Sequence, residues 1–299
     1  MISLKQINYA LAVEKYLHFK KAADHCAVSQ SALSTAINEL EKQLGVTVFE
    51  RDNKKVLVTE LGKGILQQAR KIKLGVDELY VMSQMHKQPL SAPISIGVIP
   101  TIAPFLLPKV LPGVRQEYPQ SQLKIVEEKS HVLVDMVRRG ELDTAILALP
   151  FPHEGLIAFE FWQEDFYWVT HEQDELARLK EIRSEEMDLS HLLLLKDGHC
   201  LKDHALAACH MPSSQSDSSF SGTSLTTLVQ MVAGKLGSTL VPEMALDSLV
   251  KNSAELRAVH LDEPGPHRRL AFLIRPNYVG TQNIECLIRN FRQQLAGKV

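Results

Sequence analysis

The feature that most constrains the fold is an apolar stripe at helical spacing near the N-terminus. Its members recur at intervals of four, three and four residues: Leu33, Ile37, Leu40 and Leu44. This spacing predicts a helix over residues 30–43 that buries one face, and Ser29 before it is a good N-cap residue. A shorter helical pattern over residues 19–26 precedes it, with a tight break at residues 27–28. Two helices joined in this way predict a helix-turn-helix.

The opposite face of the longer helix carries short hydrogen-bonding side chains near its N-terminal end. Together with the N-cap serine they are Ser29, Gln30, Ser31, Ser34, Thr35 and Asn38. The N-terminal part of a recognition helix is the part that meets base edges in the major groove of DNA. We therefore interpret these residues as contacts to double-stranded DNA. The alternative from pattern alone is an amphipathic helix pair with a solvated face.

A hairpin with a basic tip follows this helix pair. Residues 48–51 and 56–59 are predicted strands on either side of the turn, and the cations Arg51, Lys54 and Lys55 are the expected phosphate contacts of such a wing. A solvated turn is the alternative. Residues 1–90 carry 13 Lys and Arg against 9 Asp and Glu, whereas the rest of the chain carries 20 against 26. The N-terminal segment therefore suits a polyanion better than the remainder does.

A long helix is predicted to start after Thr59, which acts as its cap. Its apolar side chains are spaced by threes and fours: Leu61, Ile65, Ala69, Ile72, Val76 and Leu79. This stripe extends past the compact wing, and an unpartnered apolar stripe is most simply covered by the same helix of a second subunit. Residues 87–93 contain two prolines and read as a linker.

The N-terminal motifs resemble those of a known family. They are Phe19–Ala23, Val28–Ser34, Ile37–Glu41, Leu44–Val46, Phe49–Arg51 and Thr59–Gly62. Their order is similar to the winged helix-turn-helix of LysR-type transcriptional regulators. The resemblance implies a DNA-binding regulator that is not an enzyme, with a winged domain over residues 1–59 and a dimerising linker helix over residues 60–92.

Beyond the linker, strand and helix patterns alternate. Strands are predicted at 94–99, 123–126 and 144–148, with helices between them, which indicates consecutive βαβ units and a parallel sheet. The fold class is therefore α/β. The family resemblance implies two Rossmann-like subdomains of periplasmic-binding-protein type within residues 93–299: subdomain I over 93–163 and 268–299, and subdomain II over 164–267. The effector cleft would lie where the chain crosses between them.

The chain has four cysteines, and two of them share one short polar segment. Cys200 and Cys209 lie nine positions apart in it, while Cys26 and Cys286 are interpreted as small structural hydrophobes. The chain has no apolar run long enough for a membrane span and no signal-peptide layout at its start, so we expect a cytoplasmic protein without a membrane partner. Thiols there are kept reduced, and a disulfide is transient, catalytic or sensing.

The sensor segments resemble one group within that family, the peroxide-sensing regulators. The matching segments are Gly97–Thr101, Leu107–Pro108, Gly140–Asp143, Asp197–Asp203, Cys209 and Thr223–Ala233. By position, the resemblance implies that Cys200 is the peroxidatic thiol and Cys209 the resolving thiol. It also implies that hydrogen peroxide is held by Thr101, Ser130, His199, Lys202, Asp203 and Arg269, and it leaves open which of Arg268 and Arg269 points inward. No cofactor or metal is implied.

The same resemblance implies an activator of antioxidant genes that contacts RNA polymerase and assembles as a homotetramer, a dimer of dimers. Helical geometry predicts the switch: if residues 200–209 are helical, the two thiol-bearing Cα atoms lie about 13 Å apart. A disulfide needs less than about 7 Å. Closing the bridge would therefore unwind the segment, and we expect this to change subunit packing.

Three other interpretations stay open from the sequence. The first is a regulator of the same family that binds a small metabolite in the cleft, with the cysteines incidental. The second is a thiol peroxidase or oxidoreductase, although the chain has no Cys-x-x-Cys motif and the DNA reader would then lack a purpose. The third is adventitious zinc or copper binding by His199, His204 and His210 around the thiols.

Overall fold

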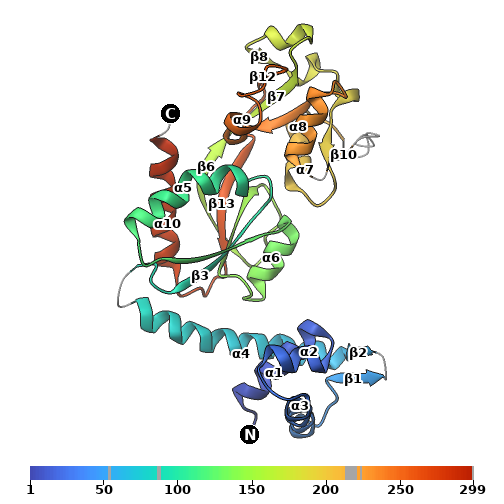
Figure 1. The fold of residues 1–299 in the computed structure, drawn as a ribbon, viewed down its shortest axis with the longest axis vertical. Helices are drawn as coiled ribbons and strands as arrows, with labels where there is room; N and C mark the ends of the chain where they lie inside the picture. Colours follow the sequence, from blue (N-terminus) through green and yellow to red (C-terminus); the bar gives the residue numbers. More distant parts are fainter. Residues whose placement is uncertain (53–54, 86–88, 213–220, 223, 298–299) are drawn as a thin grey trace. The chain divides into compact units, whose positions relative to one another are not determined.

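The computed structural model describes residues 1–52, 55–85, 89–212, 221–222 and 224–297. It divides into two compact units, Met1–His86 and Lys87–Val299, and each is described separately (Figure 1). No helix among the described residues is long and apolar enough to cross a bilayer.

The N-terminal unit is a winged helix-turn-helix followed by a long helix. Its elements are α1 (Leu4–Tyr16), α2 (Phe19–His25), α3 (Gln30–Leu44), β1 (Phe49–Asp52), β2 (Lys55–Val58) and α4 (Glu60–Met85). Strands β1 and β2 form an antiparallel pair in which Phe49 lies opposite Val58. The three predicted helices and the hairpin are thus confirmed.

The boundaries of α3 follow from its end residues. The side chain of Ser29 accepts a hydrogen bond from the Ala32 backbone N–H at 3.2 Å, which satisfies one of the donors left free at a helix start. Gly45 ends the helix in the left-handed conformation, with φ +70°, which glycine adopts without a Cβ clash. Between these ends Leu33 and Ile37 are fully buried against α1, α2 and the wing, as the stripe predicted.

Helix α4 begins where the sequence predicted, because the Thr59 hydroxyl accepts the Gly62 backbone N–H at 2.8 Å. Its first turns pack on α1, and Arg70 forms an ion pair with Glu14. Large apolar side chains elsewhere along this helix stay exposed: Leu61, Ile72, Leu79 and Met82. The predicted second subunit on this face remains a prediction.

The C-terminal unit contains two larger sheets and a short strand pair. Its strands are β3 (Pro93–Val98), β4 (Gln122–Glu127), β5 (Thr144–Leu149), β6 (Ile157–Glu164), β7 (Phe166–His171), β8 (Glu181–Ile182), β9 (Leu194–Leu195), β10 (Ser221–Gly222), β11 (Thr239–Pro242), β12 (Leu256–Leu261) and β13 (Arg268–Ile274). Its helices are α5 (Ala103–Glu117), α6 (Ser130–Arg138), η1 (Glu175–Arg178), η2 (Ser184–Glu186), η3 (Leu189–His191), α7 (Cys200–Ala208), α8 (Leu225–Ala233), α9 (Glu243–Leu249) and α10 (Thr281–Ala296).

The first sheet has the order β4-β3-β5-β13-β6. Strands β4, β3 and β5 are parallel, as predicted, whereas β13 runs antiparallel to both of its neighbours, β5 and β6. Helices cover both faces of this sheet: Phe272 of β13 packs against Phe291 of α10, while Arg275 donates to the Val137 carbonyl of α6 at 3.0 Å. Gly97 of β3 allows α6 to pack closely on the sheet, because a Cβ at this position would clash with the Leu133 side chain.

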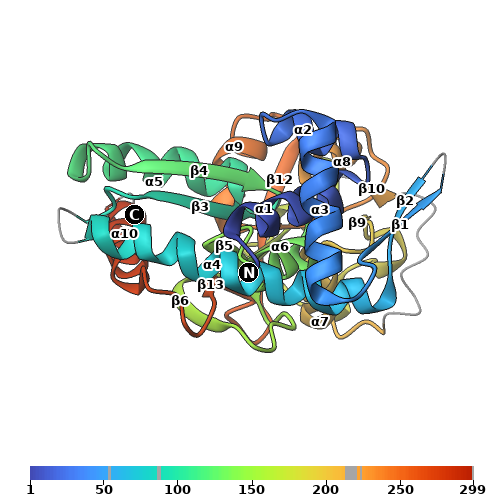
Figure 2. The ribbon, with the colours of Figure 1, turned by 90° about the horizontal axis from the view of Figure 1, so that it is seen from below.

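The second sheet has the order β11-β7-β12-β8 and is mostly antiparallel. The chain enters it after Glu164 and leaves it before Arg268, and these two residues lie opposite each other in the β6–β13 register. The two crossings predicted near residues 163 and 267 are therefore adjacent. Figure 2 gives a second view of these elements. The predicted α/β architecture, a winged helix-turn-helix and a long helix followed by two α/β subdomains, is confirmed.

Candidate functional site

The predicted DNA-contacting side chains gather at the start of α3. Ser29, Gln30, Ser31, Thr35 and Asn38 are exposed and Ser34 is half-buried. The Ser29 and Ser31 hydroxyls lie 3.1 Å apart, so the N-cap is part of a small polar cluster. This surface offers hydroxyl and amide groups, which can hydrogen-bond to base edges and phosphates.

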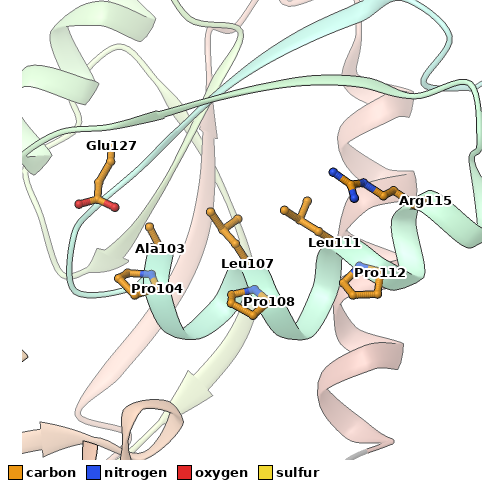
Figure 3. A pocket seen from close by; sticks show the side chains of 8 residues that line it. All are labelled: Ala103, Pro104, Leu107, Pro108, Leu111, Pro112, Arg115 and Glu127. Atoms are coloured by element: carbon orange, nitrogen blue, oxygen red, sulfur yellow. The ribbon is translucent and has the colours of Figure 1, made fainter. Parts of the chain in front are cut away.

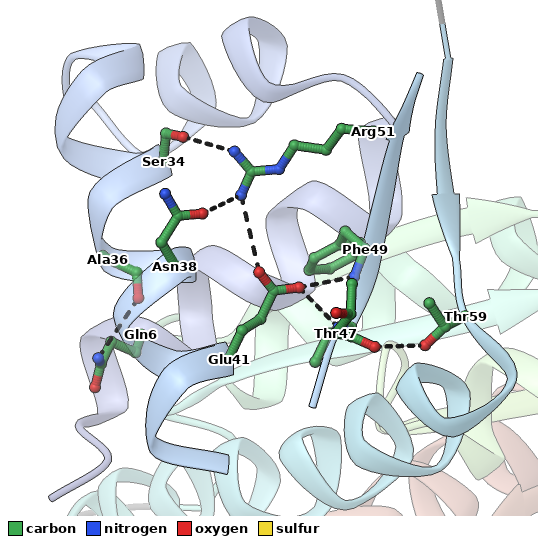
Figure 4. A network of polar contacts seen from close by, with 10 residues as sticks. Gln6, Ser34, Ala36, Asn38, Glu41, Thr47, Phe49, Arg51 and Thr59 are labelled. Atoms are coloured by element: carbon green, nitrogen blue, oxygen red, sulfur yellow. Dashed lines mark hydrogen bonds and ion pairs between the residues drawn. The ribbon is translucent and has the colours of Figure 1, made fainter. Parts of the chain in front are cut away.

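Arg51 of the wing folds back over α3 instead of extending into solvent (Figure 4). Its guanidinium donates to the Ser34 hydroxyl at 2.9 Å and to the Asn38 amide oxygen at 2.6 Å. It also lies 4.0 Å from a Glu41 carboxylate oxygen and 4.2 Å from the centre of the Phe19 ring. Arg51 therefore holds two predicted base-contacting side chains in place.

Glu41 ties the same network to the wing backbone. One of its carboxylate oxygens accepts the backbone N–H groups of Val48 at 2.7 Å and Phe49 at 2.9 Å (Figure 4). Of the other predicted phosphate contacts, Lys55 is exposed at the start of β2, and Lys54 lies outside the described residues. The wing and the recognition helix thus form one polar unit around Arg51.

Replacing Arg51 with alanine is expected to lower affinity for a specific DNA site by about tenfold. The reason is that Ser34 and Asn38 lose the donor that orients them. Because the Arg51 charge is already close to Glu41, the slope of log affinity against log salt should change little. Lys55→Ala is the matched control, and it should reduce that slope by about one. A comparable slope change in Arg51→Ala would instead make Arg51 a phosphate contact.

The two predicted redox cysteines lie at opposite ends of one helix. Cys200 is the first residue of α7 and Cys209 is its C-cap residue, so the helical spacing used in the sequence prediction is confirmed. Both thiols are free and buried, with 2% and 3% of their surface exposed. The start of a helix favours a thiolate, since backbone N–H groups point toward it.

The end of α7 that carries Cys200 meets the carboxyl edge of the parallel strands. Thr101 follows β3, and Ser130 opens α6 just after β4. Both residues are buried, and their hydroxyl oxygens have no hydrogen-bond partner among the described residues. In open α/β sheets, this edge is where ligands bind. The Ser130 hydroxyl can donate to the Cys200 sulfur once the thiol ionises.

Of the two adjacent arginines, Arg268 is the one that turns inward. Its side chain is fully buried, its Nε lies 3.6 Å from a Glu164 carboxylate oxygen, and its three guanidinium nitrogens have no hydrogen-bond partner among the described residues. Arg269, which the sequence resemblance placed at the peroxide, is exposed and donates to Glu160 at 2.8 Å. Of the two arginines, Arg268 is therefore the one that faces the interior, and a peroxide contact by Arg269 stays a prediction.

Opposing effects act on the Cys200 thiol. Burial raises its pKa, whereas the Arg268 charge, the Ser130 hydroxyl and the Ala148 backbone N–H lower it. The net direction is upward, so the resting thiol is largely protonated at neutral pH. The groups that lower the pKa are those that stabilise negative charge on sulfur or on a departing oxygen.

The other predicted peroxide contacts are placed differently. His199, the N-cap residue of α7, is buried, and burial together with Lys129 lowers its pKa, which favours the neutral ring. Lys202 donates to an Asp197 carboxylate oxygen at 2.7 Å, and Asp203 is exposed on α7. The positive field at the thiol therefore comes from Arg268 more than from Lys202.

His204 is a buried side chain on α7, four residues after Cys200. From the sequence it was predicted only as a ligand of an adventitious metal ion. One ring nitrogen, Nε2, lies 2.9 Å from the Pro150 carbonyl oxygen. The other, Nδ1, is buried without a partner among the described residues. The signal that would have found it is its spacing, since residues four apart on a helix lie on one face.

Cys209 lines a pocket of about 790 Å³ together with His210 and Glu263. Glu263 accepts from the Ser184 backbone N–H at 2.9 Å and lies 3.2 Å from the His210 ring. Burial, with the Glu263 charge, raises the pKa of Cys209 to about 12. Cys209 is therefore an inert thiol while α7 is intact.

Further pockets in this unit lie elsewhere. One of about 410 Å³ runs along α5, where Pro104, Leu107 and Pro108 face it and Arg115 and Glu127 lie at its two ends (Figure 3). Another, of about 620 Å³, includes Lys109, Trp162 and Tyr167. No group of histidine, cysteine and carboxylate side chains suited to a metal ion occurs within the described ranges.

A winged helix-turn-helix followed by an α/β domain with two sheets is typical of a class of DNA-binding regulators. Comparison with family models identifies the same class. Residues 4–63 match the bacterial regulatory helix-turn-helix protein model of the LysR family, and residues 87–296 match the LysR substrate binding domain. The chain belongs to the LysR family of transcriptional regulators, which are not enzymes.

Relatives within this family include OxyR. The DNA-binding transcriptional dual regulator OxyR of Escherichia coli is 33% identical over 99% of this chain and 97% of its own length. The HTH-type transcriptional regulator EstR of Acinetobacter baylyi is 38% identical over 91% of this chain and 90% of its own.

Solved structures give the same relationship. Full-length OxyR of Pseudomonas aeruginosa, with one cysteine changed to aspartate, superposes with a TM-score of 0.80 at 33% identity, covering 98% of both chains. A peroxide-bound cysteine-to-serine variant of Corynebacterium glutamicum OxyR gives 0.68 at 31% identity, covering 99% of this chain and 94% of that one.

Proposed function

We propose that this regulator senses hydrogen peroxide through a reversible Cys200–Cys209 disulfide and activates antioxidant genes when oxidised. The observation that carries the proposal is the surroundings of Cys200, a buried thiol at a helix start. Beside it lie a buried arginine and two buried hydroxyls whose donors have no partner within the described part of the chain. Such donors stabilise the oxygen that leaves when the O–O bond breaks. The peroxide-bound structure of a relative supports the same ligand.

Hydrogen peroxide would oxidise the two thiols in two steps. The Cys200 sulfur attacks one peroxide oxygen, the O–O bond breaks, and the other oxygen leaves as hydroxide, which takes up the thiol proton and becomes water. Cys200 is then a sulfenic acid, oxidised by two electrons. In the second step the Cys209 sulfur displaces the sulfenic oxygen as water, and the disulfide forms.

The second step requires α7 to unwind. Residues 200 and 209 lie at the two ends of the helix, about 13 Å apart at 1.5 Å per residue, against less than about 7 Å in a disulfide. A short-loop disulfide contributes about 3 kcal/mol through chain entropy, while shifting a two-state equilibrium from 1:99 to 99:1 takes about 5.5 kcal/mol. The oxidation itself supplies the remainder.

This rearrangement would act on DNA through subunit packing. We propose a tetramer built as a dimer of dimers, in which subunits pair through the exposed apolar face of α4. The tetramer contacts RNA polymerase at its promoters. A cytoplasmic location suits the switch, because thiol reductants there reset the disulfide.

A second candidate function is a regulator that binds a small metabolite. The pocket of about 620 Å³ with Trp162 and Tyr167 is large enough for such a ligand. In this case Cys200 would be a buried structural residue.

The free-thiol count separates the two candidates. The thiols are alkylated under denaturing conditions and counted by intact mass, before and after one equivalent of hydrogen peroxide. The count should fall from four to two. The lost pair should map to a Cys200–Cys209 linked peptide, while Cys26 and Cys286 serve as internal controls. Four remaining thiols at low peroxide would reject the redox switch and favour the metabolite pocket.

A further inference from the structure

His204 is a buried polar side chain that the reaction described above does not use. It is 4% exposed. Its Nε2 lies 2.9 Å from the Pro150 carbonyl oxygen, and since a carbonyl only accepts hydrogen bonds, Nε2 carries the proton. The lone pair is therefore on Nδ1, which is buried and has no partner among the described residues. An unpaired buried acceptor is costly and calls for an explanation.

The position of His204 connects it to the thiol. It follows Cys200 by four residues on α7, which puts both side chains on one helix face. Both also meet the end of β5: the Ala148 N–H acts on Cys200, and the Pro150 carbonyl holds His204. The charge of Arg268 acts on both side chains.

The other buried groups near His204 that lack a partner among the residues described are mostly hydrogen-bond donors. The guanidinium of Arg268 only donates, and the hydroxyls of Thr101 and Ser130 can each donate one hydrogen bond. Hydrogen peroxide itself carries two O–H donors and so needs acceptors. Burial, aided by the Arg268 charge, lowers the pKa of His204 to about 4, so its ring stays neutral and able to accept near pH 7.

We propose that His204 orients hydrogen peroxide for attack, with Nδ1 accepting the O–H of the oxygen that the Cys200 sulfur attacks. The assignment rests on the proposed peroxide-sensing function and adds a substrate contact to it. When the S–O bond forms, the electron pair of the O–O bond leaves on the far oxygen, beside Arg268, and that hydroxide becomes water with the thiol proton. His204 gains and loses no proton overall.

The test compares His204→Leu and His204→Gln in a Cys209→Ser background, where oxidation stops at the Cys200 sulfenic acid. The rate constant with hydrogen peroxide should fall about 10- to 100-fold in His204→Leu. It should recover most of this loss in His204→Gln, whose amide oxygen can accept. His191→Leu, the same change at an exposed histidine, is the control and should not alter the rate.

A second reagent separates positioning from folding. Methyl methanethiosulfonate is an electrophile that the Cys200 sulfur attacks with loss of methanesulfinate, and it has no O–H or N–H donor. Its rate at Cys200 should therefore stay within about twofold in all three variants. Equal losses with both reagents in His204→Leu would show a structural role and overturn the proposal, as would an unchanged peroxide rate. A parent protein whose Cys200 does not react with peroxide would instead reject the proposed function itself.

Discussion

The Cys200→Ser variant is expected to lose peroxide sensing altogether. The rate of oxidation by stoichiometric hydrogen peroxide should fall by three orders of magnitude or more, because a serine hydroxyl is not ionised at neutral pH and cannot form a sulfenic acid. The replacement keeps the size and the burial of the side chain, so we expect α7 to remain folded. Stopped-flow mixing with peroxide and a peroxide-responsive promoter fusion measure the two consequences.

The Cys209→Ser variant is the matched control for this prediction. Its Cys200 should be oxidised at close to the parent rate, because Cys209 is at the far end of α7 and is inert until the helix unwinds. The sulfenic acid should then accumulate and be trapped by dimedone, without a disulfide. A promoter response that survives in Cys200→Ser would refute the thiol switch, whatever happens in the control.

The second large effect is expected at Arg268. Arg268→Leu leaves the Glu164 carboxylate buried without its partner, which costs about 3–5 kcal/mol of folding free energy. In the proposed reaction it also removes the cation that would stabilise the departing oxygen, so the peroxide rate constant should fall about 100- to 1,000-fold. Arg269→Leu, one residue along the same strand, removes only an exposed pair with Glu160. It should change stability by less than about 1 kcal/mol and the rate by less than about twofold.

A double variant separates the two effects of Arg268. In Arg268→Leu with Glu164→Gln, the buried charge is gone and the amide oxygen can still accept the Met244 backbone N–H that Glu164 accepts at 2.9 Å. Stability measured by denaturant should largely recover, while the peroxide rate stays low. If the rate recovers with the stability, Arg268 acts only through folding. If Arg269→Leu is the slower variant, the sequence assignment was right and the structural one is wrong.

Sequence alone predicted the elements whose pattern is local. The stripe of α3 and its Ser29 cap are short-range features, and the helix lies within one residue of the prediction. The parallel direction of β3, β4 and β5 was also predicted, because a helix pattern separates each strand from the next. The antiparallel pairing of β13 was not predicted, because its neighbours β5 and β6 lie more than 100 residues earlier in the chain.

The placement of Cys200 and Cys209 at the two ends of one helix was predicted from the sequence, whereas the charged side chains around them were not. Neighbouring arginines at 268 and 269 point to opposite faces of a strand, and the pattern does not say which face is the interior. The partner that settles it, Glu164, is distant in sequence and opposite in register. Arg51 was expected to extend toward phosphates, yet Ser34 and Asn38 are its partners, and they come from a separate helix.

The exposed apolar side chains of α4 have a consequence for the DNA target. Leu79 and Met82 are 64% and 51% exposed, and two copies of such a helix that cover each other are related by a two-fold axis. The two recognition helices then read opposite strands with the same residues. The promoter element is therefore expected to be an inverted repeat, with half-sites separated by a whole number of turns of about 10.5 base pairs.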